Sequence, residues 1–254
     1  MATTDGVDLP RRLRVELLGV ATLVGVGLAV GTAVVAVEPR RWAVGAAAAT
    51  VVLFVAVRAG LPRNHSPSGG EIRPTIGSAN AVTLLRGGAI CAVAGFVLAE
   101  PAIAWLPAAL YAVAVGLDAV DGAIARRTER TVLGARLDGG VDAYGVAVGG
   151  AAAVALGGVP AWYLLAGAAW PIYAGALWIR RRRGRPLYEL PPSRLRGPIG
   201  AAQMLVIVAA LAPGVDGRPV AVAAAIALVP LLVGFGRDWA AASGRWPVHG
   251  PRRE

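Results

Sequence analysis

The sequence predicts an all-α protein that crosses a membrane about eight times as a polytopic helical bundle. Of its 254 residues, 56% are hydrophobic and only 16% are charged, whereas soluble domains carry about 25% charged residues. The apolar residues gather in runs of about 20, the length that spans a bilayer core as a helix. The same composition excludes a disordered chain, a coiled coil and a disulfide-rich secreted scaffold, and the single Cys91 can form no internal disulfide.

The expected spans form four pairs, and each pair is joined by a short turn that contains Pro or Gly. In chain order the pairs and their turns are 16–37 and 42–59 around Glu38–Arg41, 81–99 and 102–120 around Glu100–Pro101, 139–157 and 160–179 around Gly158–Pro160, and 198–213 and 219–236 around Pro213–Arg218. The connections between the pairs are longer and rich in Arg. We therefore expect the helices to alternate in direction.

The arginines predict the orientation of this bundle. If the N-terminus is cytoplasmic, 22 of the 25 basic residues, all of them Arg, lie on that side, in segments 11–14, 58–86, 126–136, 180–196 and 237–253. The other side holds three, which are Arg40, Arg41 and Arg218. Such a split follows the positive-inside rule and predicts a plasma-membrane protein with both termini in the cytoplasm. The rule also accounts for the net charge of +10, so no nucleic-acid partner is expected.

A polar loop divides the chain. Residues 61–80 are rich in Pro, Gly, Ser and Asn, which predicts a cytoplasmic connecting loop. It separates an extra transmembrane helix pair at 1–60 from a six-helix core at 81–238. A cytoplasmic tail follows at 239–254.

Four aspartates lie within or at the ends of two expected spans. Asp118 and Asp121 are spaced i, i+3 near the cytoplasmic end of the fourth span, and Asp138 and Asp142 are spaced i, i+4 where the fifth opens. Each pair therefore shares a helix face. A short Arg-rich turn makes the two helices antiparallel neighbours, so all four carboxylates can converge at one shallow depth.

Such a cluster needs a counter-charge. An Asp at mid-bilayer costs about 2.5–3.5 kcal/mol, and neither helix face offers a neutralising partner. Carboxylate oxygens suit Mg²⁺, Mn²⁺ or Ca²⁺, and no nearby His or Cys indicates zinc. Two divalent ions held by carboxylates are a common arrangement for displacement at phosphorus, and Arg126 can clamp a phosphate. The alternative is that these aspartates are helix caps or partners of nearby arginines.

The stretch 118–142 resembles the signature of the CDP-alcohol phosphotransferase (CDP-alcohol phosphatidyltransferase) family, D-x-x-D-G-x-x-A-R, a spacer, then G-x-x-x-D-x-x-x-D. All eight positions are filled, by Asp118, Asp121, Gly122, Ala125, Arg126, Gly134, Asp138 and Asp142. The spacer after Arg126 is shorter than usual for the family. Upstream, Asn80, Thr83 and Arg86 match the Asn-x-x-Thr-x-x-Arg pattern with which members often begin their first core helix.

The resemblance implies an integral membrane enzyme of phospholipid synthesis. Members transfer a phosphatidyl-type group from a CDP-linked lipid to an alcohol and release CMP, and they are commonly homodimers. It implies two divalent ions, Mg²⁺ or Mn²⁺, on Asp118, Asp121 and Asp138, with Asp142 completing the site and acting as general base. The residues implied for CDP binding are Asp118, Gly122, Ala125, Arg126 and Gly134.

The acceptor alcohol is less well specified. Candidate headgroup or acceptor residues are Asn80, Thr83, Arg86, Arg194 and Arg196. The basic loop around the last two favours a phosphorylated acceptor, such as glycerol phosphate or inositol phosphate; the alternatives are a topological signal and contact with anionic lipid. Arg86 has the alternative of snorkelling to the membrane surface.

Two other classes of membrane protein also use intramembrane carboxylates. A cation-coupled transporter can use intramembrane carboxylates, but transporters more often show inverted repeats and broken helices at mid-membrane, and neither is evident here. A membrane prenyltransferase carries its two Asp motifs far apart in sequence, whereas these pairs are separated by one turn. A further alternative is a family member that has kept the fold but catalyses a different reaction.

Overall fold

The computed structural model describes residues 9–125 and 131–246, apart from the side chains of residues 121, 123 and 125. Within these residues the chain forms eight α-helices and no β-strand, which confirms the predicted fold class. The helices are α1 (Arg11–Gly31), α2 (Pro39–Gly60), α3 (Ser78–Ala94), α4 (Leu106–Ala125), α5 (Val132–Ala155), α6 (Leu164–Arg182), α7 (Arg196–Leu211) and α8 (Gly217–Ala242).

Five of the helices in the described part of the chain are long and apolar enough to cross a membrane by themselves. They are α1, α2, α3, α6 and α8 together with the short turns that flank some of them, whereas α7 and residues 106–120 of α4 are shorter apolar helices. Large apolar side chains on the outer helices point away from the bundle, for example Leu18, which is 66% exposed, and Ile226, which is 70% exposed. An apolar exterior of this kind fits lipid and not water.

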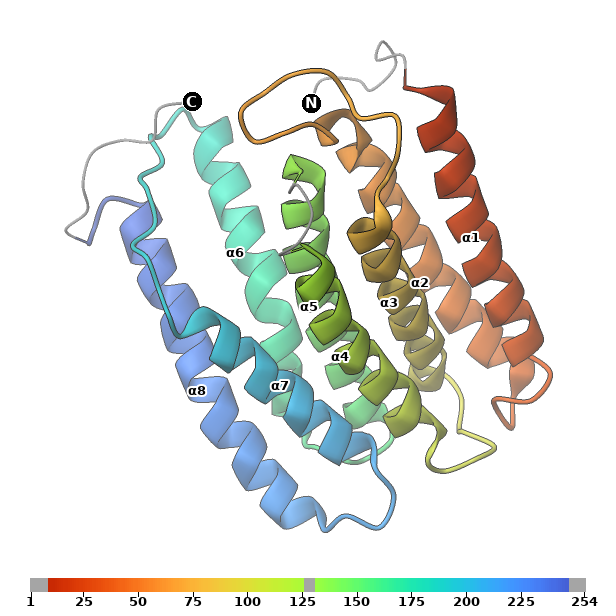
Figure 1. Ribbon diagram of the computed structural model, residues 1–254. Coiled ribbons are helices and arrows are strands. Elements are labelled where there is room, and N and C mark those ends of the chain that lie inside the picture. Colours follow the sequence, from red (N-terminus) through yellow and green to blue (C-terminus); the bar gives the residue numbers. More distant parts are fainter. Residues whose placement is uncertain (1–8, 126–130, 247–254) are drawn as a thin grey trace.

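The helices alternate in direction, as the turns predict (Figure 1). The end at which α1, α3, α5 and α7 begin is called the Arg-rich end, because the connecting segments 61–77 and 183–195 lie there. In Figure 1, segment 183–195 runs down beside α8 before α7 begins. It is attached to α8 by a hydrogen bond from the Tyr188 amide to the Ala242 carbonyl (3.2 Å).

Helix α3 lies at the centre of the N-terminal half, in contact with α1, α2, α4 and α5. Its central position buries polar residues as well as apolar ones, since Asn80, Thr83 and Arg86 are all at most 8% exposed. These three residues recur at i, i+3 and i+6 and therefore share one face. The chain thus brings a polar stripe of α3 into the bundle interior.

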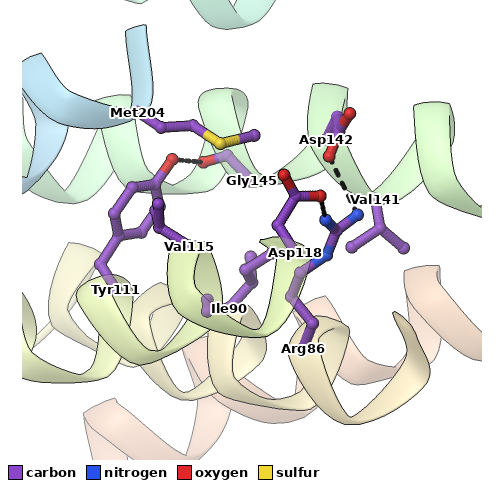
Figure 2. Close-up of a pocket in the computed structure, with 10 residues that line it drawn as sticks. Arg86, Ile90, Tyr111, Val115, Asp118, Val141, Asp142, Gly145 and Met204 are labelled. Atoms are coloured by element: carbon purple, nitrogen blue, oxygen red, sulfur yellow. Dashed lines mark hydrogen bonds and ion pairs between the residues drawn. The ribbon is translucent and has the colours of Figure 1, made fainter. Parts of the chain in front are cut away.

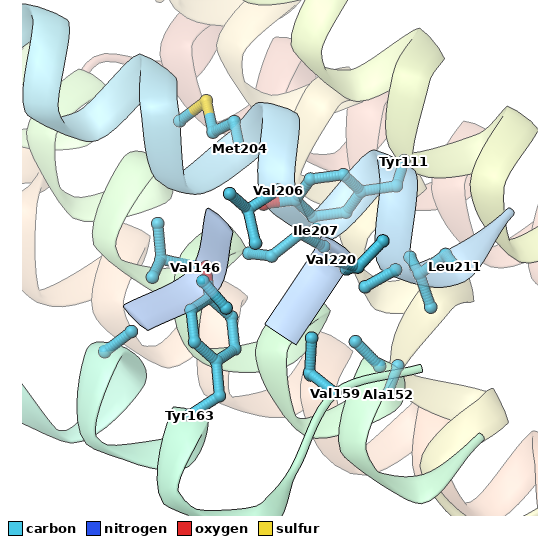
Figure 3. Packing of buried hydrophobic residues seen from close by; sticks show 14 of the residues in the cluster. Tyr111, Val146, Ala152, Val159, Tyr163, Met204, Val206, Ile207, Leu211 and Val220 are labelled. Atoms are coloured by element: carbon cyan, nitrogen blue, oxygen red, sulfur yellow. The ribbon is translucent and has the colours of Figure 1, made fainter. Parts of the chain in front are cut away.

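The C-terminal half of the bundle has its own apolar core, shown in Figure 3. Tyr111 of α4 and Ile207 of α7 both pack directly over Gly149 of α5, where a Cβ atom would lie 2.8 Å from Ile207 Cγ2. The buried Gln203 side chain links helices by donating to the Ala227 carbonyl (2.6 Å) and accepting from the Tyr163 hydroxyl (2.7 Å). This tight packing fixes α4 and α5 side by side, which determines the geometry of the residues near their ends.

Candidate active site

Three carboxylates meet between α4 and α5, toward the Arg-rich end. Asp118, Asp138 and Asp142 each offer an oxygen atom within 4.8 Å of the others. Their side chains are 38%, 56% and 41% exposed, so each retains access to solvent or ligand. The predicted convergence of the two helix faces is therefore present for these three residues. Asp121 lies on α4 one turn after Asp118, and its side chain is outside the described part of the chain.

Local sequence explains why α5 presents its aspartates in this position. Thr131 caps the helix, because its Oγ1 accepts a hydrogen bond from the Gly134 amide (2.9 Å). The amide of Val132 donates to the His65 carbonyl (3.0 Å), which attaches the helix start to the α2–α3 loop. With its first turn held on both sides, α5 places Asp138 and Asp142 one turn apart and facing α4.

A buried cation lies beneath the carboxylates. Arg86 of α3 is only 2% exposed, and its guanidinium contacts all three carboxylates. Figure 2 shows its contacts with Asp118 and Asp142. One terminal nitrogen, Nη1, pairs with Asp118 Oδ1, and the other, Nη2, lies 2.9 Å from Asp142 Oδ1 and 3.5 Å from Asp138 Oδ1. Arg86 Nη2 also donates to the Asp138 backbone carbonyl (3.3 Å).

This ion-pair network corrects one sequence-based expectation. The sequence predicts that the helix faces carrying the aspartates offer no neutralising partner; the cation that pairs with these carboxylates comes from a third helix, α3. Arg86 does not snorkel to the membrane surface, because its side chain ends inside the bundle. The signal in the sequence was an arginine one turn inside an apolar span, since a buried guanidinium there needs acidic partners.

The charge balance leaves room for divalent ions. Three carboxylates face one guanidinium, so the described cluster carries an excess of two negative charges, to which Asp121 would add a third. Arg86 approaches from the bundle interior, while the carboxylates keep their exposed sides free of it. Oxygen ligands in this arrangement are the type that Mg²⁺ and Mn²⁺ prefer. The residues present therefore fit the expected ions.

On its inner side the cluster is closed by an apolar floor. Ile90, Val115 and Met204 line a cavity of about 10 Å³ beneath Asp118 and Asp142, which holds no more than about one water. Tyr111 closes the same floor and donates its hydroxyl hydrogen to the Gly145 carbonyl (3.1 Å). Sequence reasoning did not select Tyr111 or Met204, because nothing in their local pattern distinguishes them from core residues.

The structure also brings together two predicted residues from different motifs. Gly134 of α5 lies against Asn80 of α3, and a Cβ atom at Gly134 would come within 2.7 Å of Asn80 Oδ1. A glycine is needed there because any side chain would collide with this buried amide. Of the other signature residues, Gly122 is on α4, while Arg126 and the Ala125 side chain lie outside the described residues.

The two arginines at the start of α7, Arg194 just before it and Arg196 at its first residue, have different surroundings. Arg194 is exposed. Arg196 forms a two-pronged ion pair with Asp238 of α8, with Nε 3.1 Å from Oδ2 and Nη2 3.0 Å from Oδ1. Arg196 therefore connects the start of α7 to α8. Its predicted contact with an acceptor stays a prediction, as does that of Arg194.

Comparison with known proteins is consistent with this site. No curated protein and no solved structure matches the chain. A family model described as CDP-alcohol phosphatidyltransferase matches residues 77–235, which is more than half of the sequence. The matched region starts at the residue before α3, ends inside α8 and contains every carboxylate of the cluster. The chain therefore belongs to the CDP-alcohol phosphatidyltransferase family.

Proposed function

We propose that this protein transfers a phosphatidyl-type group from a CDP-linked lipid to an alcohol, with release of CMP, as a step of phospholipid synthesis. The observation that carries the proposal is the convergence of Asp118, Asp138 and Asp142 in a protein of this family. The position of the cluster supports it as well. A site toward one end of a lipid-exposed bundle lets the donor's acyl chains stay in the bilayer while its polar head meets a water-soluble acceptor.

In the proposed reaction Asp142 is the general base. Its carboxylate takes the proton from the acceptor hydroxyl, and the resulting oxygen forms a bond to the lipid-linked phosphorus. The bond from that phosphorus to the oxygen of CMP breaks, and CMP leaves with the electron pair. Asp142 is 41% exposed, which leaves its carboxylate accessible to an acceptor, and we therefore assign the acceptor proton to it.

All four aspartates, Asp142 included, also have a proposed role in metal binding. We assign Asp118, Asp121, Asp138 and Asp142 to two Mg²⁺ or Mn²⁺ ions, which when bound offset the negative charge of the diphosphate and of the departing CMP. Arg86 holds three of these carboxylates in fixed orientations from below. Positioned carboxylates need no rearrangement when the ions and the diphosphate arrive.

Substrate contacts are proposed on the surrounding residues. Gly122, Ala125, Arg126 and Gly134 are assigned to the cytidine diphosphate. Asn80, Thr83, Arg86, Arg194 and Arg196 are the proposed headgroup or acceptor residues, with glycerol phosphate or inositol phosphate as acceptor. We further propose a homodimer in the plasma membrane with the Arg-rich end in the cytoplasm.

The test is CMP release by the purified protein. The assay combines a CDP-linked lipid, Mg²⁺ or Mn²⁺, and a panel of acceptor alcohols. We expect metal-dependent release with one acceptor, and its loss by about 10²-fold or more in Asp142→Ala. Glu38→Gln is the matched control, because Glu38 is exposed at the opposite end and pairs with Arg41.

Absence of CMP release with every acceptor, from folded protein, would contradict the proposal. Cation transport into vesicles that contain the same purified protein would then favour the transporter alternative.

A further inference from the structure

One acidic residue of the extra helix pair bonds to the backbone just before α3. Helix α1 is loosely packed, and Leu13 and Val24 are its only buried residues. Between these two residues, the Glu16 carboxylate leaves the helix and accepts a hydrogen bond from the backbone amide of Ile76 (2.7 Å). Ile76 lies two residues before α3, so this bond joins the first helix to the start of the helix that carries Arg86.

The bond lies beside a groove between α1 and the start of α3. Small residues on both sides, Gly19 on α1 and Gly77 and Ala81 near the start of α3, leave a groove of about 400 Å³ beside Glu16. Gly77 has a φ of +83°, so the backbone turns sharply immediately after Ile76. A hydrogen bond to a charged acceptor at this turn therefore sets the direction in which α3 begins.

From Ile76 the connection continues into the site. The Ile76 carbonyl accepts from Asn80 Nδ2 (2.8 Å), which fixes the orientation of the Asn80 amide. The other end of that amide, Oδ1, lies against Gly134 of the family signature. Arg86 follows Asn80 by six residues, so a change at the start of α3 also changes the height of the guanidinium beneath the carboxylates.

Two further contacts involve the α2–α3 loop and helix α1. Asn64 is fully buried, and its Nδ2 donates to the Thr75 carbonyl (2.8 Å), which shapes the loop just before Ile76. Farther along α1, Val24 packs over Gly88 of α3, where a Cβ atom would lie 2.8 Å from Val24 Cγ2. Helix α1 thus contacts α3 on both sides of Arg86 in sequence.

We propose that Glu16 is a positioning residue of the active site, which acts through the Ile76 amide to hold Asn80 against Gly134 and Arg86 beneath the aspartates. The kinetic effect that we expect rests on the proposed function, whereas the structural effect does not. The Glu16 contact gives the N-terminal helix pair a role that the family match, which begins at residue 77, does not cover.

The first arm of the test is independent of activity. Amide hydrogen exchange followed by mass spectrometry is measured on peptides that cover Ile76, in the full chain and in detergent. We expect faster exchange at this amide in Glu16→Ala, and near-normal exchange in Glu16→Gln, whose side-chain oxygen can still accept. Unchanged exchange in Glu16→Ala would overturn the proposal. If Glu16→Ala yields no folded protein, Glu16→Asp, whose carboxylate is one methylene shorter, is measured instead under the same criterion.

The second arm is the kinetics of CMP release by the same variants. Because Glu16 acts through Asn80 on Gly134, which is assigned to the cytidine diphosphate, we expect the KM for the CDP-linked lipid to rise roughly tenfold in Glu16→Ala, with a smaller change in kcat and recovery in Glu16→Gln. Glu38→Ala, at the opposite end, is the matched control. Unchanged KM and kcat in folded Glu16→Ala would overturn the proposal, because a merely structural residue lowers yield and not substrate affinity.

The two arms separate this inference from the proposed function. Wild-type protein without CMP release would contradict the function, while the exchange arm would still decide whether Glu16 holds the Ile76 amide. Active wild-type protein with unaltered exchange and kinetics in the variants would contradict the Glu16 inference alone.

Discussion

Arg86 organises the site at the residue scale. Its planar guanidinium reaches three carboxylates that belong to two other helices. A lysine carries the same charge but is a compact ammonium without the fork that pairs with several carboxylates at once. The identity of the cation, and not only its charge, therefore matters for the arrangement of Asp118, Asp138 and Asp142.

Substitution of Arg86 separates charge from geometry. We expect Arg86→Lys to remain folded but to release CMP roughly tenfold more slowly, because one ammonium cannot orient three aspartates. Arg86→Met should lose the reaction and also about 1–3 kcal/mol of stability, less than a fully buried ion pair because the carboxylates are about half exposed. The measurements are thermal unfolding in detergent and CMP release. Equal activity of Arg86→Lys and wild type would contradict this account.

The sequence predicts some of the contacts in this site and not others. The convergence of Asp118 with Asp138 and Asp142 was predictable, because it depends on helical spacing and one short turn. The contacts of Arg86 and the Glu16–Ile76 bond were not, because they depend on how α3 packs against helices distant in the sequence. Spacing predicts which residues share a face, but it does not predict which face a third helix will cover.

At the scale of the elements, α5 is held by close packing around Gly149. Tyr111 from α4 and Ile207 from α7 both occupy the space that a side chain there would need. The neighbouring Gly150 is different, since a Cβ atom would meet the Tyr163 ring at an ordinary 3.7 Å. Two adjacent glycines of one helix therefore provide a matched pair.

We expect Gly149→Ala to destabilise the protein by about 1–3 kcal/mol, since α4 and α7 must move to accommodate the methyl group. Gly150→Ala should be neutral or stabilising by up to about 1 kcal/mol, because alanine is the better helix former. Thermal unfolding of both variants in the same detergent checks the difference. Equal unfolding temperatures would show that α5 does not depend on this close approach.

The helix boundaries differ in places from those that the sequence predicts. The eight helices and their short turns were predicted, because Pro and Gly interrupt the apolar runs. The third span was expected at 81–99, whereas α3 is Ser78–Ala94, followed by a short 3-10 turn at Gly95–Val97. The helix starts earlier because its first turn, at Ser78–Asn80, is polar, and hydropathy detects only apolar residues.

At the scale of the whole molecule, the charged loops predict which end of the bundle faces the cytoplasm. The chain has one cysteine, Cys91, and it is fully buried. New cysteines can therefore report accessibility without background. Ser68 is exposed in the α2–α3 loop, and Val215 is 47% exposed between α7 and α8 at the opposite end.

In intact cells we expect a membrane-impermeant maleimide to label Val215→Cys and to leave Ser68→Cys unlabelled until the membrane is permeabilised. The physical reason is the retention of Arg-rich loops on the cytoplasmic side during insertion. Labelling of Ser68→Cys in intact cells would contradict this orientation, because it would place the Arg-rich end and the candidate active site outside the cytoplasm.

The buried guanidinium beneath the carboxylates also has a consequence for biogenesis. A cluster of acidic groups whose counter-charge came only from dissolved ions would have to wait for those ions before the helices could assemble. Arg86 arrives with the nascent chain, and α3 is synthesised before α4 and α5, so the cation is in place when the aspartates are inserted. Part of the negative charge of the cluster is thereby balanced within the chain itself, before any dissolved cation reaches the site.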